Sequence, residues 1–102
     1  MADRRRFSVS IVTPTGAAFE GDAELLIVPG AAGEIGVLAR HAPLVAMLKA
    51  GSTRVYESYD NEEVREFATG PGFFQVMQDR AIALVDDAVA ARESAPKSSA
   101  SS

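Results

Sequence analysis

The sequence predicts an all-β protein, an antiparallel β-sandwich of roughly eight to ten short strands with at most a short C-terminal helix. Three observations support this prediction. Apolar and polar residues alternate over short segments, turn-forming residues separate these segments, and helical periodicity is almost absent before the end of the chain. Two packed antiparallel sheets or a closed barrel would both satisfy this pattern, and we favour the sandwich.

The first half of the chain predicts a series of short strands. Phe7, Val9 and Ile11 alternate with more polar neighbours, which places this set on a buried face. Pro14 and Gly16 end the strand. The next expected strands, each bounded by turn residues, are residues 17–20, which stop at Gly21-Asp22, then 25–28, 34–38 and 44–48.

The second half continues in the same way. Residues 53–59 and 63–69 are expected to form a hairpin around Asp60-Asn61. Residues 73–77 and 81–85 follow as two further strands, and we expect Ile82 and Leu84 to face inward.

Five residues are more apolar than the exposed positions of an edge strand usually are. We expect most of them to lie in the core and a minority to form an interaction face. They are Met47, Leu48, Phe73, Phe74 and Met77.

The end of the chain has a different character. Residues 86–93 begin with two acidic residues and continue with good helix formers, which predicts a short helix. The small, polar segment after it predicts disorder. We therefore expect a β-sandwich domain over residues 1–87, and a short helix with a disordered Ser-rich tail over residues 88–102.

Composition excludes several classes of function. The 102 residues suffice for one domain with a core, and the net charge of −4 argues against a nucleic-acid partner. The absence of cysteine excludes disulfides, thiolate catalysis and sulfur-ligated metals. No apolar run approaches the roughly 20 residues that a membrane-spanning helix needs. We expect membrane association only through a partner.

The sequence offers no catalytic constellation. His41 is the sole histidine, so no His pair is available for a metal, and no serine stands in a nucleophile motif. We expect no catalytic residue, no metal site and no cofactor. His41 is then a turn residue that bonds to the backbone or faces a partner.

Residues 28–51, VPGAAGEIGVLARHAPLVAMLKAG, form the most unusual segment. Gly30, Gly33 and Gly36 recur every three residues, and we expect them to set tight turns with repeated positive φ. The segment matches no nucleotide-binding fingerprint. Glu34 could project from it as a negative contact. Two further structural turn residues in this segment are Pro43 and Gly51.

Three stretches resemble one known family. IVTPTGAAFEGDAE, then residues 28–51, then VREFATGPGFFQV are similar to the N-terminal β-sandwich domain of the epsilon subunit of F-type ATP synthase, called delta in mitochondria. The run from Ile11 to Val85 that carries the resemblance covers about three quarters of the chain. Its most specific piece is GEIGVLARHAPLV.

The resemblance implies a non-catalytic rotor subunit of the proton-translocating ATP synthase. Such a subunit clamps the gamma subunit and contacts the c-ring, so that ion flow is coupled to ATP synthesis. Glu34 and His41 match positions that face the c-ring, whose loops are polar and carry basic character. Thr13 and Ala46 match positions toward gamma. The implied location is the cytoplasmic face of the bacterial cell membrane, or the stromal face of the thylakoid for a plastid-encoded protein.

Family members commonly continue with a C-terminal helical hairpin that can inhibit hydrolysis and in some members binds ATP. Only DDAVAARE precedes the Ser-rich tail here, so we expect neither property. The alternative is a free-standing β-sandwich module that binds a sugar or peptide. An aromatic content of 7% without tryptophan disfavours sugar stacking.

Overall fold

The computed structural model describes residues 5–58 and 63–94, and within them it contains ten β-strands and no helix. The strands are β1 (Phe7–Thr13), β2 (Gly16–Ala23), β3 (Leu25–Gly30), β4 (Gly33–Val37), β5 (Leu44–Leu48), β6 (Gly51–Ser58), β7 (Glu63–Thr69), β8 (Gly72–Met77), β9 (Arg80–Val85) and β10 (Ala88–Ser94). The expected all-β class is confirmed.

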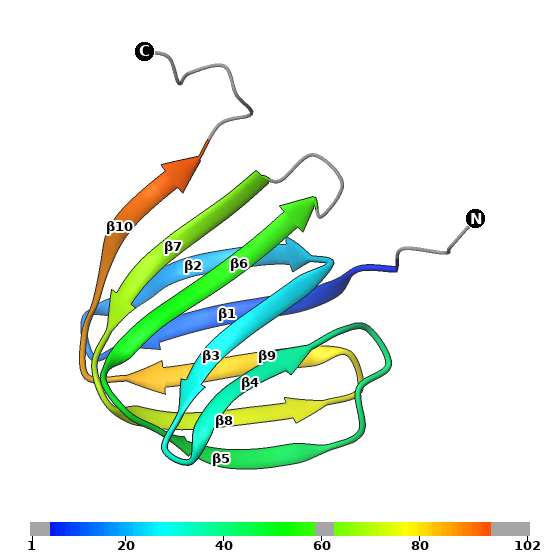
Figure 1. Ribbon diagram of the computed structural model, residues 1–102, viewed down its shortest axis with the longest axis horizontal. Helices are drawn as coiled ribbons and strands as arrows, with labels where there is room; N and C mark the ends of the chain where they lie inside the picture. Colours follow the sequence, from blue (N-terminus) through cyan, green and yellow to red (C-terminus); the bar gives the residue numbers. More distant parts are fainter. Residues whose placement is uncertain (1–4, 59–62, 95–102) are drawn as a thin grey trace.

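The strands form two layers that cross at an angle (Figure 1). One layer has the order β10-β7-β6-β3, with β4 on the free side of β3, and the other has the order β5-β8-β9-β1-β2. The pair Gly30–Leu48 joins β3 to β5, so hydrogen bonding continues from one layer into the other. Among the described strands, only β1 and β9 run parallel.

One row of inward side chains shows how the second layer packs. Ala46, Phe74, Ala83, Ile11 and Phe19 lie opposite one another on β5, β8, β9, β1 and β2. Phe74 and Ile11 are fully buried. Small side chains on both sides of Phe74 leave room for its ring, which is the interdigitation that close packing requires.

The alternation predicted for β1 is confirmed, because Phe7, Val9 and Ile11 are all buried. The expected facing of β9 is wrong. Leu84 is 48% exposed, and Ala81, Ala83 and Val85 point inward instead. The inner row explains the difference, because a leucine in place of Ala83 would fill the space beside Phe74.

The expectation that most of the five apolar residues of β5 and β8 lie in the core is also wrong. Leu48 and Phe74 are buried, whereas Met47, Phe73 and Met77 are 60%, 39% and 46% exposed. Adjacent strand residues point to opposite faces, so Phe73 and Phe74 cannot both enter the core.

The helix expected at residues 86–93 is not formed. Ala88–Ser94 is strand β10, which pairs antiparallel with β7, so the sandwich extends past residue 87. Pairing with the otherwise open edge of β7 outweighs the intrinsic helix propensity of the alanines. The Ser-rich tail lies outside the described residues.

One other strand boundary differs from the expectation, and one expected turn cannot be compared. β2 continues through Gly21-Asp22 to Ala23, where we expected the strand to stop. The ring of Phe19 lies against Gly21, so that a Cβ there would come within 3.1 Å of it. The turn expected at Asp60-Asn61 lies outside the described residues.

The two adjacent phenylalanines of β8 allow a direct test of the strand register. Phe74→Ala should lower the free energy of unfolding by about 3–5 kcal/mol, because it empties a fully buried site. Phe73→Ala should cost about 1 kcal/mol or less, because this ring is partly exposed. Urea unfolding of both variants measures the difference. Equal losses would show that the facing of β8 is wrong.

Candidate functional site

Residues 28–51 run through β3, β4 and β5, at the corner where the two layers join. Gly30 is buried there, and a Cβ on it would come within 2.5 Å of the Gly33 carbonyl oxygen. A Cβ on Gly51 would come within 2.9 Å of Pro29. These two glycines therefore permit close approach of chain segments.

The expectation of repeated positive φ is correct for Gly33 alone of the three regularly spaced glycines. Gly33 has a φ of 143° and follows the turn between β3 and β4. Gly30 and Gly36 are not among the positive-φ residues, and Gly36 lies inside β4 with open space beside it. Pro43 lies in the segment between β4 and β5.

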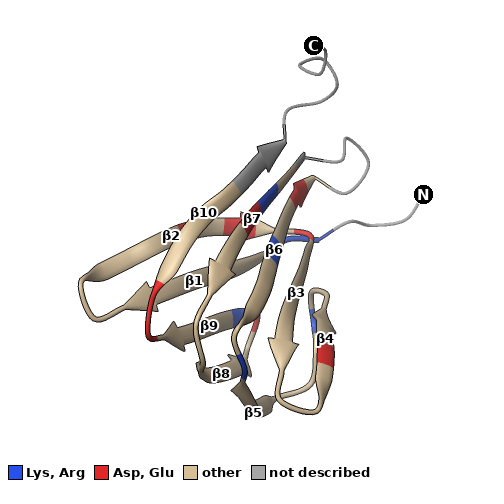
Figure 2. Ribbon diagram, turned by 60° about the vertical axis from the view of Figure 1, so that its left-hand side comes forward, with Lys and Arg blue, Asp and Glu red and all other residues tan. Residues whose placement is uncertain are grey.

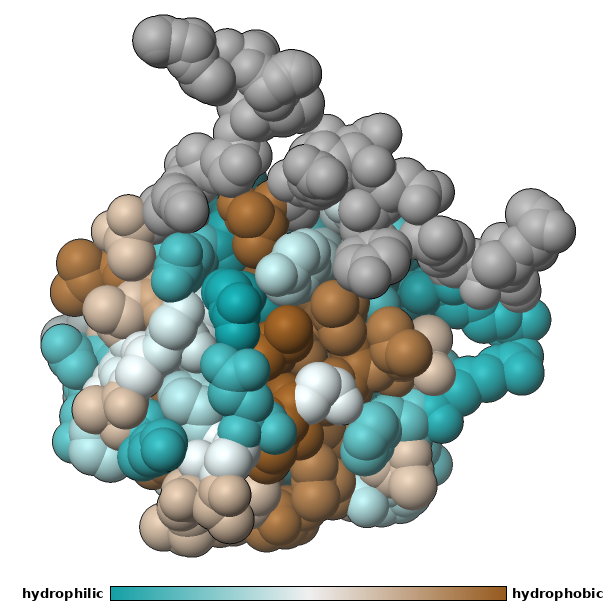
Figure 3. Space-filling model, in the orientation of Figure 1, coloured by the Kyte–Doolittle hydropathy of each residue, from teal (hydrophilic) through white to brown (hydrophobic). Residues whose placement is uncertain are grey.

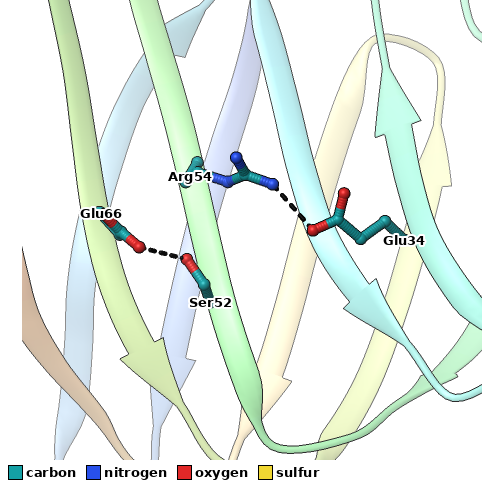
Figure 4. Close-up of polar contacts among 4 residues, drawn as sticks. All are labelled: Glu34, Ser52, Arg54 and Glu66. Carbon is teal, nitrogen blue, oxygen red and sulfur yellow. Dashed lines mark hydrogen bonds and ion pairs between the residues drawn. The ribbon is translucent and has the colours of Figure 1, made fainter.

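Glu34 lies on β4, and its side chain is 62% exposed. It is not a lone charge, because Arg54 on β6 donates a hydrogen bond from Nη2 to Glu34 Oε2 at 2.8 Å. The two side chains meet over β3, which lies between their strands (Figure 4). The Arg54 side chain is 30% exposed, so water still screens the pair.

A second polar contact lies beside the first (Figure 4). Ser52 on β6 donates from Oγ to Glu66 Oε2 on β7 at 2.6 Å, and Glu66 stands directly opposite Arg54 in the register. Arg54 therefore lies between two acidic residues, Glu34 and Glu66. The negative charge of Glu34 is balanced within the chain itself.

His41 lies in the segment that leads from β4 to β5 and is half-buried. Its Nδ1 lies 2.6 Å from the carbonyl oxygen of Ala42, so the ring is held against its own backbone with Nδ1 protonated as the donor. This agrees with the expectation of a turn residue that bonds to the backbone.

Glu34 and His41 lie at opposite ends of β4. Glu34 follows the turn at its start, and His41 comes four residues after its last residue, Val37. Three residues of strand alone separate them by about 10 Å. They therefore form two separate points of a surface and not one binding pocket.

Thr13 and Ala46 do not share a surface with these two residues. Thr13 ends β1, where its hydroxyl bonds the Gly16 carbonyl oxygen at 3.0 Å. Ala46 stands opposite Phe74 on the inner side of its layer. The neighbours of these two residues, Val12, Val45 and Met47, point to the outer side.

The outer side of that layer carries an exposed apolar surface. We expected an interaction face from a minority of the five apolar residues of β5 and β8, but not its extension across four strands. Met47, Phe73, Leu84 and Val12 stand opposite one another on β5, β8, β9 and β1, and we call them the apolar row. The first three are 60%, 39% and 48% exposed. Exposed apolar side chains that adjoin across four strands indicate a protein-contact surface. Only the strand register brings them together.

The outer side of the other layer is more polar. Figure 3 views this side, where teal and white side chains lie over β6 and β7 and brown ones gather toward β3 and β4. Basic and acidic positions are interspersed over both layers (Figure 2). A surface of mixed sign fits protein contacts better than it fits binding of a polyanion.

The described residues offer no group of three or more His, Cys, Asp or Glu side chains that could hold a metal ion. In the same part of the chain, no helix is sufficiently long and apolar to cross a bilayer.

Comparison with known families gives one match over most of the chain. A family model described as the β-sandwich domain of the ATP synthase delta/epsilon chain matches residues 6–91. The ATP synthase epsilon chain of Shouchella clausii is 41% identical over 80 residues, 78% of this chain. That of Dichelobacter nodosus is 40% identical over 87 residues, 85% of this chain. The chain spans 58% and 59% of the lengths of these relatives.

Solved structures share the fold. A chain of the Euglena gracilis mitochondrial ATP synthase (OSCP/F1/c-ring) matches with a TM-score of 0.75 at 18% identity, over 87% of this chain and 56% of that one. A chain of the Tetrahymena thermophila mitochondrial ATP synthase central stalk and c-ring matches with a TM-score of 0.67 at 12% identity, over 85% of this chain and 68% of that one.

The pair of Glu34 and Arg54 should contribute little to stability. A double-mutant cycle with Glu34→Gln and Arg54→Met should give a coupling of less than about 1 kcal/mol, because the carboxylate is mostly exposed. The coupling should fall further in about 1 M salt, where the screening length is only a few ångströms. Urea unfolding of the four proteins measures it. A coupling above about 2 kcal/mol that salt leaves unchanged would contradict the exposed geometry.

Proposed function

The chain belongs to the ATP synthase delta/epsilon chain family, and we propose that it is a non-catalytic subunit of the central stalk that clamps gamma and contacts the c-ring. In this role it turns with the rotor and couples ion flow to ATP synthesis. It associates with the membrane through the complex, on the cytoplasmic side in a bacterium. Family membership over residues 6–91 carries the proposal.

The apolar row supports the gamma contact. A domain of this size has no need to expose Met47, Phe73 and Leu84 side by side, and burying such a cluster against a partner is strongly favourable. Thr13 and Ala46 lie next to this surface in the chain, since Val12 and Met47 are their neighbours. Their part is to hold the backbone of β1 and β5, while the neighbouring side chains meet gamma.

Glu34 and His41 support the ring contact at two separate points. A polar loop with basic character can approach the exposed carboxylate of Glu34 and take over the hydrogen bond that Arg54 now donates. The imidazole of His41, held by the contact of Nδ1 with the Ala42 carbonyl oxygen, supplies the second polar contact. Two points at the two ends of β4 resist tilting better than one.

The described residues end in strand β10 and contain no helical arm.

The gamma contact predicts a sharp effect of charge in the apolar row. Met47→Asp or Leu84→Asp should weaken the complex with the gamma subunit of the same ATP synthase at least about tenfold, because each buries an unpaired carboxylate at the interface. Calorimetric titration measures the affinity, and circular dichroism with urea unfolding checks the fold.

Val89→Asp is the matched control. Val89 is 60% exposed, as Met47 is, but lies in the other layer on β10. This variant should bind gamma as the unchanged chain does. If Val89→Asp weakens binding and Met47→Asp does not, the gamma surface is assigned to the wrong layer.

The ring contact predicts an effect of Glu34→Lys on coupling. The substitution should lower proton-driven ATP synthesis by reconstituted complexes more than it lowers the stability of the isolated chain. It places a lysine against both Arg54 and the basic loop of the ring.

Asp86→Lys makes the same change of charge at an exposed position between β9 and β10, and it should leave synthesis unchanged. Unchanged ATP synthesis in the Glu34→Lys complex would remove Glu34 from the ring contact.

A further inference from the structure

Three non-glycine residues with positive φ meet at one end of the molecule. Arg40 has a φ of 66°, Gln78 of 51° and Asp79 of 59°, and they are the non-glycine residues in the described chain that take this conformation. Gln78 and Asp79 form the two-residue turn between β8 and β9. Arg40 belongs to the segment between β4 and β5, 39 residues earlier.

Asp79 connects this turn to two other parts of the chain. Its Oδ1 accepts a hydrogen bond from the backbone N–H of Arg40 at 2.6 Å. Its carbonyl oxygen accepts one from the backbone N–H of Ser8, next to the start of β1, at 3.0 Å. One residue thus fixes the β8–β9 turn against both the N-terminal strand and the segment that carries His41.

The contact to Arg40 acts on a strained backbone position. A side chain at positive φ is disfavoured unless the surroundings hold it there, and arginine gains no local hydrogen bond of the kind that Asn or Asp can make. The bond to Asp79 fixes the N–H of the residue directly before His41. The direction in which His41 leaves the backbone therefore depends on a carboxylate from another strand pair.

We propose that Asp79 is the positioning residue of the His41 segment. Its carboxylate holds Arg40 in the left-handed conformation and so presents His41 to the polar loop of the c-ring. The part of this inference that concerns the ring rests on the proposed function. The part that concerns the segment's conformation can be tested on the isolated chain.

Two substitutions separate the carboxylate from the turn that carries it. Asp79→Gly removes the acceptor oxygen but keeps the turn, because glycine takes positive φ without cost. Asp79→Asn keeps an acceptor oxygen at the same place, and asparagine also tolerates this conformation. Neither variant is expected to unfold the protein.

The first measurement is hydrogen exchange at single amides by NMR. Asp79→Gly should speed exchange of the Arg40 amide about fivefold or more, while Asp79→Asn should leave it close to the original rate. The Ser8 amide is an internal control, because it bonds the main chain of Asp79 and should stay protected in both variants. If the Arg40 amide exchanges at the same rate in Asp79→Gly, the inference is wrong.

The second measurement is the affinity of each variant of the 102-residue chain for a purified complex of c-ring and gamma in detergent. Asp79→Gly should bind about fivefold more weakly and Asp79→Asn about as well as the unchanged chain. Adding Arg40→Gly to Asp79→Gly should restore part of the affinity, because glycine adopts the required φ unaided. Equal weakening by both Asp79 variants would overturn the positioning role in favour of a simple charge effect.

His41→Ala separates this inference from the proposed function. If His41→Ala and Glu34→Lys both leave ring binding unchanged, the proposed ring contact fails, and the Arg40 exchange rate alone decides whether Asp79 holds the segment. If they weaken binding and Asp79→Gly does not, the ring contact stands and Asp79 is not its positioning residue.

Discussion

The burial of Phe74 between two alanines is the constraint on which the second layer depends. Because adjacent residues of a strand face opposite sides, placing Phe74 inward forces Phe73 outward. Because of the strand register, the neighbouring strands follow the same pattern. Ala46 and Ala83 lie in the inner row, and Met47 and Leu84 point to the outer side. The exposed apolar row is thus the complement of a well-packed core. Moving it inward would require a slip of the whole layer.

The corner at Gly30 constrains the other layer, as Phe74 constrains the second. β3 pairs with β4 on one side and β6 on the other, and its last residue reaches Leu48 of β5. Glu34 and the segment with His41 therefore extend from strands that are bound on several sides. Strands bound on several sides deform little, because close-packed protein interiors are hardly compressible.

Much of the fold was predictable from local sequence, whereas the site depended on contacts that local sequence does not encode. The alternation in β1 identified its buried face, and turn residues located most strands. The facing of β9 was missed because Leu84 is more hydrophobic than Ala83, and only the ring of Phe74 decides between them. Strand β10 was not predicted because its partners on β7 lie 19 to 30 residues away in the chain. Arg54 and Asp79 carry no local signal for contacts made 20 and 39 residues away.

The two kinds of surface suit two kinds of contact. Burial of the apolar row against a partner would contribute binding affinity, because no other part of the described chain covers these side chains. In the proposed ring contact, replacing Arg54 by a partner's cation at Glu34 would change the free energy little, since one exposed ion pair would replace another. Such an exchange sets orientation and approach more than strength. The proposed function would use this division, with gamma held at the apolar row of one layer and the ring met at Glu34 on the other.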